Sequence, residues 1–165
     1  MNKVELLLHG WDSCYEKEDW YPPLTDALKE LSADQANWRP EGEYVNTIWE
    51  NVHHLIFYKD RLLKRMTGEE SDYPEGLTND DTFAVGATSN KDWQETLDRL
   101  QSVHQGIREQ IARWEEEEFE HIFPNRSQSV GRWVNSLIMH DAYHTGQIMF
   151  IRKLQGSWPS RRSFD

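Results

Sequence analysis

The sequence predicts an all-α fold, a four-helix bundle with a long crossover connection between helices 2 and 3. Four long segments carry apolar residues at helical spacing, and no segment sustains the alternation of a half-buried strand. Between the second and third segments, residues 69–88 are acidic and contain Pro74, Gly76 and Gly86, which is typical of a connection. We expect a single domain over residues 1–165, a length that can bury its own core.

The first predicted helix runs from about residue 3 to 31. It is interrupted near residues 20–23, because the two prolines there remove amide donors from the helix. Ser32 and Gln35 then form a capping-box pattern, which predicts a short helix that ends near Trp38.

The sequence also predicts where the other three helices begin and end. The second is expected over residues 45–66, with Gly68 as its C-terminal signal. The third should begin after Ser89 and fray near residue 116, where an acidic run lies at the unfavourable end of the helix dipole. The fourth should begin after Ser129 and run to about Leu154.

The charge balance excludes two classes of partner. The chain has 29 acidic and 18 basic residues and a net charge of −11, so binding to nucleic acid or to an anionic membrane surface is not expected.

The sequence also indicates the compartment. Its one cysteine, Cys14, cannot form an internal disulfide, which favours a reducing compartment. There is no signal-peptide pattern and no apolar run long enough to span a membrane, so we expect a cytoplasmic protein.

The fourth helix carries the most informative pattern. His140 and His144 are four residues apart, so their side chains project from the same side of a helix. They fall inside its apolar stripe, where two imidazoles can bind one metal ion. The pair alone fits a metal site and two hydrogen-bonded core histidines equally well. The stripe consists of Val130, Trp133, Val134, Leu137, Ile138, Ile148 and Ile151.

A third ligand is expected from the second helix, which offers His53 and His54. The apolar arc of this helix is wide, and His53 lies slightly nearer its centre. Periodicity therefore does not settle which of the two histidines turns inward.

Four stretches of the chain carry a resemblance to a known family. They are residues 24–31 followed by the segment from Ser32 to Pro40, then Thr47-Ile48 with a histidine and Leu55, and clearest of all the segment from His140 to Ile148. In these stretches the chain resembles the DinB family of DinB-like or YfiT-like metalloenzymes over nearly its whole length.

The resemblance implies a four-helix bundle with a three-histidine site, usually occupied by nickel or zinc. The family's first ligand is the histidine seven residues after the helix-opening Ser or Thr, which is His54 here. The implied metal ligands are therefore His54, His140 and His144. The family includes thiol-dependent S-transferases, some of which use bacillithiol.

The implied function is metal-dependent transfer of a low-molecular-weight thiol to an electrophile, because a bound divalent ion lowers the pKa of a coordinated thiol. Asp141 and Gln147 lie near the ligands in sequence and are the candidate catalytic residues, and Glu50 is a weaker one. One alternative is a non-catalytic metal-binding or stress-related interaction protein. Another is a metal-free bundle whose histidines are core residues.

The remaining singled-out residues are given structural roles. Cys14 is expected to be a buried apolar residue rather than a nucleophile. Trp49 and Phe57 lie off the main apolar stripe of the second helix, which suggests the contact of a homodimer. The other three histidines lack a partner at ligand spacing and are interpreted as surface or incidental residues: His9, His104 and His121.

Overall fold

The all-α prediction is confirmed. The computed structural model describes residues 1–42, 44–70 and 73–159, and every regular element in these ranges is a helix. The single domain expected over residues 1–165 includes positions outside these ranges and stays a prediction. In chain order the elements are α1 (Lys3–Tyr15), α2 (Leu24–Leu28), α3 (Ala33–Asn37), α4 (Ile48–Thr67), η1 (Asp80–Phe83), α5 (Asn90–Arg113), η2 (Glu116–Glu120) and α6 (Val130–Leu154).

The predicted capping residues form the helix ends. Ser32 and Gln35 each accept a hydrogen bond from the other's backbone N–H, which opens α3 as the sequence predicts. Gly68 adopts a φ of 76°, and its left-handed conformation ends α4. The chain therefore leaves α4 where a residue without a Cβ is least strained.

The first break comes earlier and is longer than the sequence predicts. α1 ends at Tyr15, and helix resumes only at Leu24. The N–H groups of Glu16 and Lys17 both donate to the carbonyl oxygen of Asp12 and so close the helix before the two prolines are reached. The Asp12 carboxylate also binds Arg108, which ties this helix end to α5.

The acidic run after α5 has a role that the sequence does not reveal. Instead of a frayed helix end, it forms the turn η2. Glu116 accepts a hydrogen bond of 2.9 Å from the backbone N–H of Lys3, and Glu120 pairs with the Lys3 side chain. The carboxylates thus lie at the N-terminus of α1, where the helix dipole favours negative charge.

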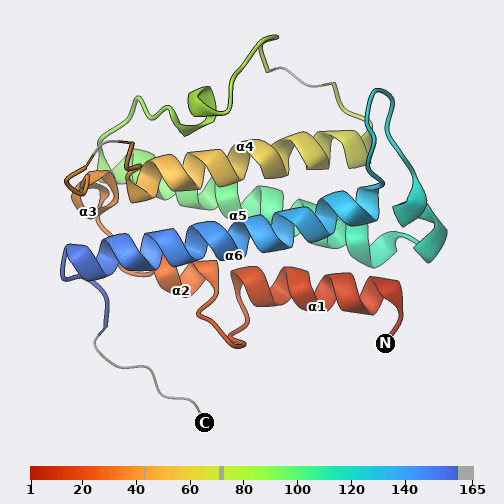
Figure 1. Ribbon diagram of the computed structural model, residues 1–165, viewed down its shortest axis with the longest axis horizontal. Coiled ribbons are helices and arrows are strands. Elements are labelled where there is room, and N and C mark those ends of the chain that lie inside the picture. The colour runs from red at the N-terminus through yellow and green to blue at the C-terminus, as the bar shows by residue number, and fades with distance from the viewer. Residues whose placement is uncertain (43, 71–72, 160–165) are drawn as a thin grey trace.

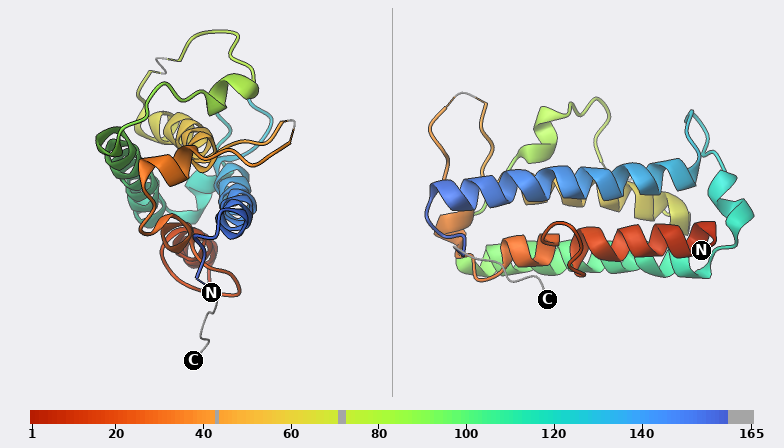
Figure 2. Two further views of the ribbon diagram at one scale, coloured as in Figure 1. Left: turned by 90° about the vertical axis from the view of Figure 1, so that its left-hand side faces the viewer. Right: turned by 60° about the horizontal axis from the view of Figure 1, so that its bottom comes forward.

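The four longest helices pack side by side (Figures 1 and 2), and the buried apolar residues that the structure describes form two clusters. Seen end on, α1 and α4 occupy opposite corners, with α5 and α6 between them (Figure 2, left). Accordingly α4 contacts both α5 and α6, and α1 contacts the same two helices. Among the described residues, no helix combines the length and apolar character needed to cross a bilayer.

The crossover connection lies between α4 and α5. These two helices run in the same direction, so the chain must return along the outside of α4 before α5 begins (Figure 1). The returning segment contains η1, which packs against α4. This topology places the crossover over the middle of α4, where the candidate site lies.

A polar network is buried at the centre of the helices. Lys59 is fully buried and contacts two groups: its Nζ lies 2.6 Å from the Asp141 carboxylate and 3.0 Å from Nδ1 of His104. The same ammonium group sits 4.3 Å from the ring centroid of Trp11. Cys14 is buried beside Asp141, as expected for a structural thiol, and burial raises its pKa well above the usual range.

Three side chains are more buried than the sequence suggests. The surface interpretation of His104 is wrong: its ring stacks between Trp11 and Tyr15 and is 2% exposed. Trp49 is fully buried and donates to Thr96, and Phe57 is 9% exposed. Neither of the two aromatic residues is therefore available for a contact with a second copy.

We expect Lys59→Met to destabilise the protein by about 3–5 kcal/mol, because it leaves the Asp141 charge buried without a counter-charge. The double variant Lys59→Met/Asp141→Asn should recover part of this loss. Lys64→Met on the same helix removes a less buried i,i+4 ion pair with Asp60, and should cost about 1 kcal/mol or less. Urea denaturation measures all three. A double variant that is no more stable than Lys59→Met would contradict this account.

Candidate metal centre

Three histidine rings meet between α4 and α6. The Nε2 atom of His140 lies 3.0 Å from Nε2 of His54 and 3.1 Å from Nε2 of His144. The structure therefore brings His54 to the pair on α6. His53 points elsewhere and lines a separate hollow with Thr96. The alternative that periodicity leaves open is resolved by packing, because α4 turns the face that carries His54 toward α6.

The crossover segment orients the ring of His54. The Nδ1 atom of His54 lies 2.5 Å from the hydroxyl oxygen of Thr82, and that hydroxyl donates its own proton to the carbonyl of Asn79. Thr82 must therefore accept the bond from His54. The proton of the neutral imidazole is held on Nδ1, and the Nε2 lone pair faces the other two rings.

Asn51 orients His144 in the same way. The Oδ1 atom of Asn51 lies 2.7 Å from Nδ1 of His144, and the Asn51 amide nitrogen donates to the carbonyl of Thr47. This second bond fixes which end of the amide faces the ring. His144 consequently carries its proton on Nδ1 and also directs an Nε2 lone pair inward.

His140 completes the set but has no orienting partner. Its Nδ1 atom is buried and forms no hydrogen bond within the described part of the chain. If His140 carries its proton on Nε2, it can donate to only one of the two lone pairs that face it. If it carries the proton on Nδ1, three lone pairs face one another. A cation among the three Nε2 atoms satisfies all of them.

The spacing of the nitrogens fits such a cation. Bonds of about 2.0–2.1 Å from an ion to two imidazoles place their nitrogens about 2.9 Å apart at a right angle and about 3.3 Å apart at the tetrahedral angle. The two distances that involve His140, 3.0 and 3.1 Å, lie between these limits, and the ligand atoms of all three histidines lie within 4.8 Å of one another. The residues present therefore fit one divalent ion with coordination positions left for another ligand.

The environment keeps all three rings neutral at physiological pH. Burial, followed by the proximity of His144 and His140, lowers the pKa of His54 to about 3. Burial, then His144 and Lys59, lowers that of His140 to about 4. Burial likewise lowers the pKa of His144 to about 4. Neutral imidazole is the form that binds metal, so the ligands are ready to bind without losing protons.

An aromatic ring covers one face of His54, and the centre also borders a cavity. Phe83 of η1 stacks on His54 with ring centroids 4.0 Å apart, and Tyr58 packs edge-on against the same ring. His54 and His140 also line a cavity of about 450 Å³ between α4, the crossover and the start of α6. A small molecule in this cavity would therefore lie against two of the three histidines.

The candidate catalytic residues lie at different places. Gln147, within hydrogen-bonding reach of His144, raises the pKa of His144 against the effect of burial. Asp141 is fully buried and binds Lys59 instead of a histidine ring. Glu50 caps α4 and pairs with Arg39. The catalytic roles of Asp141 and Gln147 stay predictions.

Sequence reasoning missed the two orienting residues, Thr82 and Asn51. Asn51 could have been found, because it lies three residues before His54 and so shares its face of the helix. Thr82 lies 28 residues from its partner, in a segment without periodicity. Only the path of the crossover brings it to the site.

Fold and site together define an all-α protein with a buried three-histidine centre. A model of the DinB superfamily matches residues 23–148, and the chain belongs to this superfamily. Its fold is similar to that of a conserved protein from Enterococcus faecalis whose crystal structure is known, with a TM-score of 0.70 at 15% identity over 93% of this chain and 97% of the other. No curated protein matches the chain.

We expect Thr82→Val to weaken binding of a divalent metal about 10–100-fold, because His54 loses the group that orients it while the side chain keeps its volume. Thr88→Val changes an exposed threonine of the same connection and should bind metal as the unaltered protein does. Calorimetric titration with zinc compares them. Equal affinity of the two variants would show that the hydrogen bond to Thr82 does not support a metal site.

The metal-free protein should lose stability as the pH falls from about 6.5 to about 4. In this range the unfolded chain protonates its histidines, whose ordinary pKa is about 6.5, while the three folded ones remain neutral. Protons therefore favour unfolding. The free energy of unfolding measured in urea at several pH values should fall less steeply in His140→Gln, and an unchanged slope in that variant would contradict the assignment.

Proposed function

We propose that this chain is a metal-dependent enzyme that transfers a low-molecular-weight thiol, such as bacillithiol, to an electrophilic small molecule. The observation that carries the proposal is the convergence of three neutral Nε2 atoms beside an open cavity, with two of the rings held by Thr82 and Asn51. Membership of the DinB superfamily supports it.

A divalent ion on the three histidines would lower the pKa of a thiol bound to it, so that the thiolate exists at neutral pH. The residues of the chain do the rest. Thr82 and Asn51 keep the ligand nitrogens directed at one point, and Phe83 screens His54 from water. The cavity beside His140 would admit the electrophile: its carbon would form the new bond to sulfur as its bond to the leaving group breaks, the leaving group would depart with that electron pair, and the thiol proton would pass to solvent.

The two candidate catalytic residues would act differently. Gln147 lies beside His144 and offers an amide that can position a substrate. Asp141 is sealed from the cavity by burial, so we assign it a positioning role: with Lys59 it fixes the part of α6 that carries His140. The proposed cofactor is zinc or nickel, since three imidazoles suit either ion. A cytoplasmic location stays a prediction.

A homodimer also stays a prediction, but the residues that could form its interface are no longer Trp49 and Phe57. One outward face of α6 carries large exposed apolar side chains, and a second copy of the chain could cover it. We expect the unaltered protein to sediment as a dimer and the Tyr143→Lys variant to sediment as a monomer. An unaltered protein that sediments as a monomer at high concentration would contradict the prediction. The exposed side chains are Met139, Tyr143, Phe150 and Leu154.

The function is tested in two steps on protein purified without an affinity tag. Elemental analysis should find one zinc or nickel ion per chain. The loaded protein should then transfer thiol from a panel of low-molecular-weight thiols to a chromogenic electrophile. His144→Gln should lose this transfer while its circular dichroism stays helical, because the variant removes a ligand that lies inside the site.

His53→Gln is the matched control, since it removes a neighbouring histidine on α4 that lies outside the centre. It should keep both metal and transfer. Metal without transfer for every thiol would favour the non-catalytic metal-binding protein. Absence of bound metal, with no uptake of added zinc or nickel, would favour the structural bundle and reject the proposal.

A further inference from the structure

The cavity beside the histidines has an unusual charge for this protein. The chain carries 29 acidic residues against 18 basic ones, yet no Asp or Glu is found among the described residues that line the cavity. Its one permanently charged side chain is Arg126, which precedes α6 together with Ser127 and Gln128. Among the described lining residues, Arg126 is therefore the one cation, and the cavity that it shares with His54 and His140 is otherwise lined by neutral side chains.

Arg126 is held in place without an acidic partner. Its guanidinium carbon lies 5.5 Å from the ring centroid of Trp133, and Arg126 forms no ion pair within the described ranges. The backbone N–H of Arg126 donates to the carbonyl of Phe123, and Asn125 adopts a φ of 60° in the same turn. The turn thus fixes the backbone of Arg126, and the indole of Trp133 supports its guanidinium.

The surroundings of Arg126 are also positive. A second guanidinium, that of Arg65, lies 5.0 Å from the Trp133 ring centroid. Burial lowers the pKa of Arg65, and the charges of Arg126 and Arg61 lower it further. Arg65 lines a neighbouring hollow with Glu117 and Glu118, and one of its guanidinium nitrogens is buried without a hydrogen-bond partner among the described residues. Of these two arginines only Arg126 is among the described residues that line the cavity beside the histidines, so its charge is the one that faces a ligand there.

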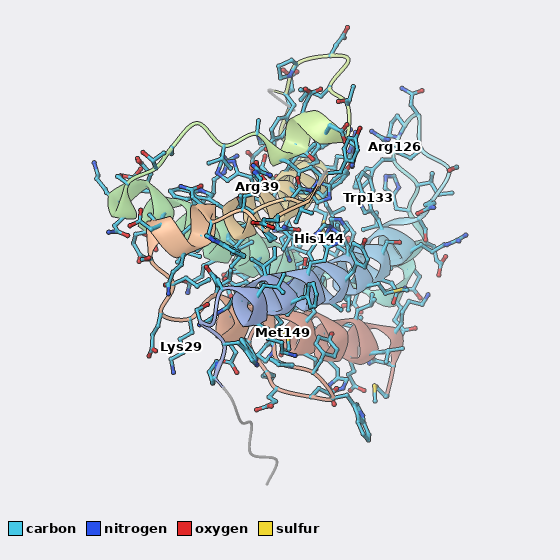
Figure 3. The ribbon with its side chains drawn as sticks, turned by 60° about the vertical axis from the view of Figure 1, so that its left-hand side comes forward. Lys29, Arg39, Arg126, Trp133, His144 and Met149 are labelled. Carbon is cyan, nitrogen blue, oxygen red and sulfur yellow. The ribbon has the colours of Figure 1, made fainter. Side chains whose placement is uncertain are left out.

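The positions of these residues form a path to the site. Arg126, Trp133 and His144 follow one another from the turn before α6 toward the histidines (Figure 3). Trp133 and His140 lie seven residues apart on α6, on the same side of the helix, and both line the cavity. An elongated small molecule along this side of α6 can therefore contact the guanidinium at one end and the Nε2 atoms at the other.

We infer that Arg126, with Ser127 and Gln128, forms a subsite for a carboxylate, so that the small molecule that reaches the three-histidine centre is an anionic thiol with a carboxylate remote from its sulfur. A guanidinium supported on an aromatic face presents two parallel N–H donors, the geometry that a carboxylate accepts. This inference rests on the proposed function, because it takes the sulfur to bind at the histidines.

The test uses the zinc-loaded protein and a series of ω-mercaptocarboxylic acids of increasing chain length, each paired with its primary amide. Calorimetric titration measures the dissociation constant of every compound. At the chain length that spans the cavity, the acid should bind at least about tenfold more tightly than its amide. In Arg126→Gln the acid and the amide should bind equally. Arg126→Lys, which keeps the charge but not the paired donors, should lie between.

Arg132→Gln is the matched control. Arg132 is exposed, lies six residues further along the chain and lines a different hollow, so its removal should leave the preference for the acid intact. If acid and amide bind equally at every length while both bind through sulfur, the carboxylate subsite is wrong and the thiol site stands. If no thiol binds to the zinc-loaded protein, the proposed function fails and the inference falls with it.

Discussion

The candidate centre depends on two hydrogen bonds that fix where two imidazole protons lie. Thr82 holds the proton of His54 on Nδ1, and Asn51 does the same for His144. Each bond is determined by a further one, from Thr82 to Asn79 and from Asn51 to Thr47. The topology supplies the first: since α4 and α5 run in the same direction, the chain must return along α4, and this return brings Thr82 to His54 (Figure 1).

The helices could be predicted because their ends are encoded locally. Ser32 with Gln35 and Gly68 act through neighbours in sequence, and their effects are visible before any packing is known. Interactions between distant segments could not be predicted. The acidic turn η2 is explained by Lys3, 113 residues away from Glu116, and the burial of His104 by rings on α1.

The same difference between local and distant interactions applies to the candidate site. The pair on α6 follows from its spacing of four, whereas the choice of His54 over His53 needed either the family resemblance or the packing of α4. A wide apolar arc leaves a helix several ways to turn, and only the neighbouring helices select one.

The structure also separates two kinds of charged group. Lys59 and Asp141 neutralise each other in the interior, while the charge of Arg126 remains available at the cavity.

The missing partner of His140 makes the three rings unequal. Two of them are held by hydrogen bonds at their outer nitrogens, whereas the outer nitrogen of His140 forms no hydrogen bond in the described part of the chain. Rotation of this one imidazole can absorb a change in ionic radius or in the number of bound molecules while the other two stay still. The two rings that Thr82 and Asn51 hold should therefore stay in place. His140, which lines the cavity, should tilt when one metal replaces another, and the backbone should not move.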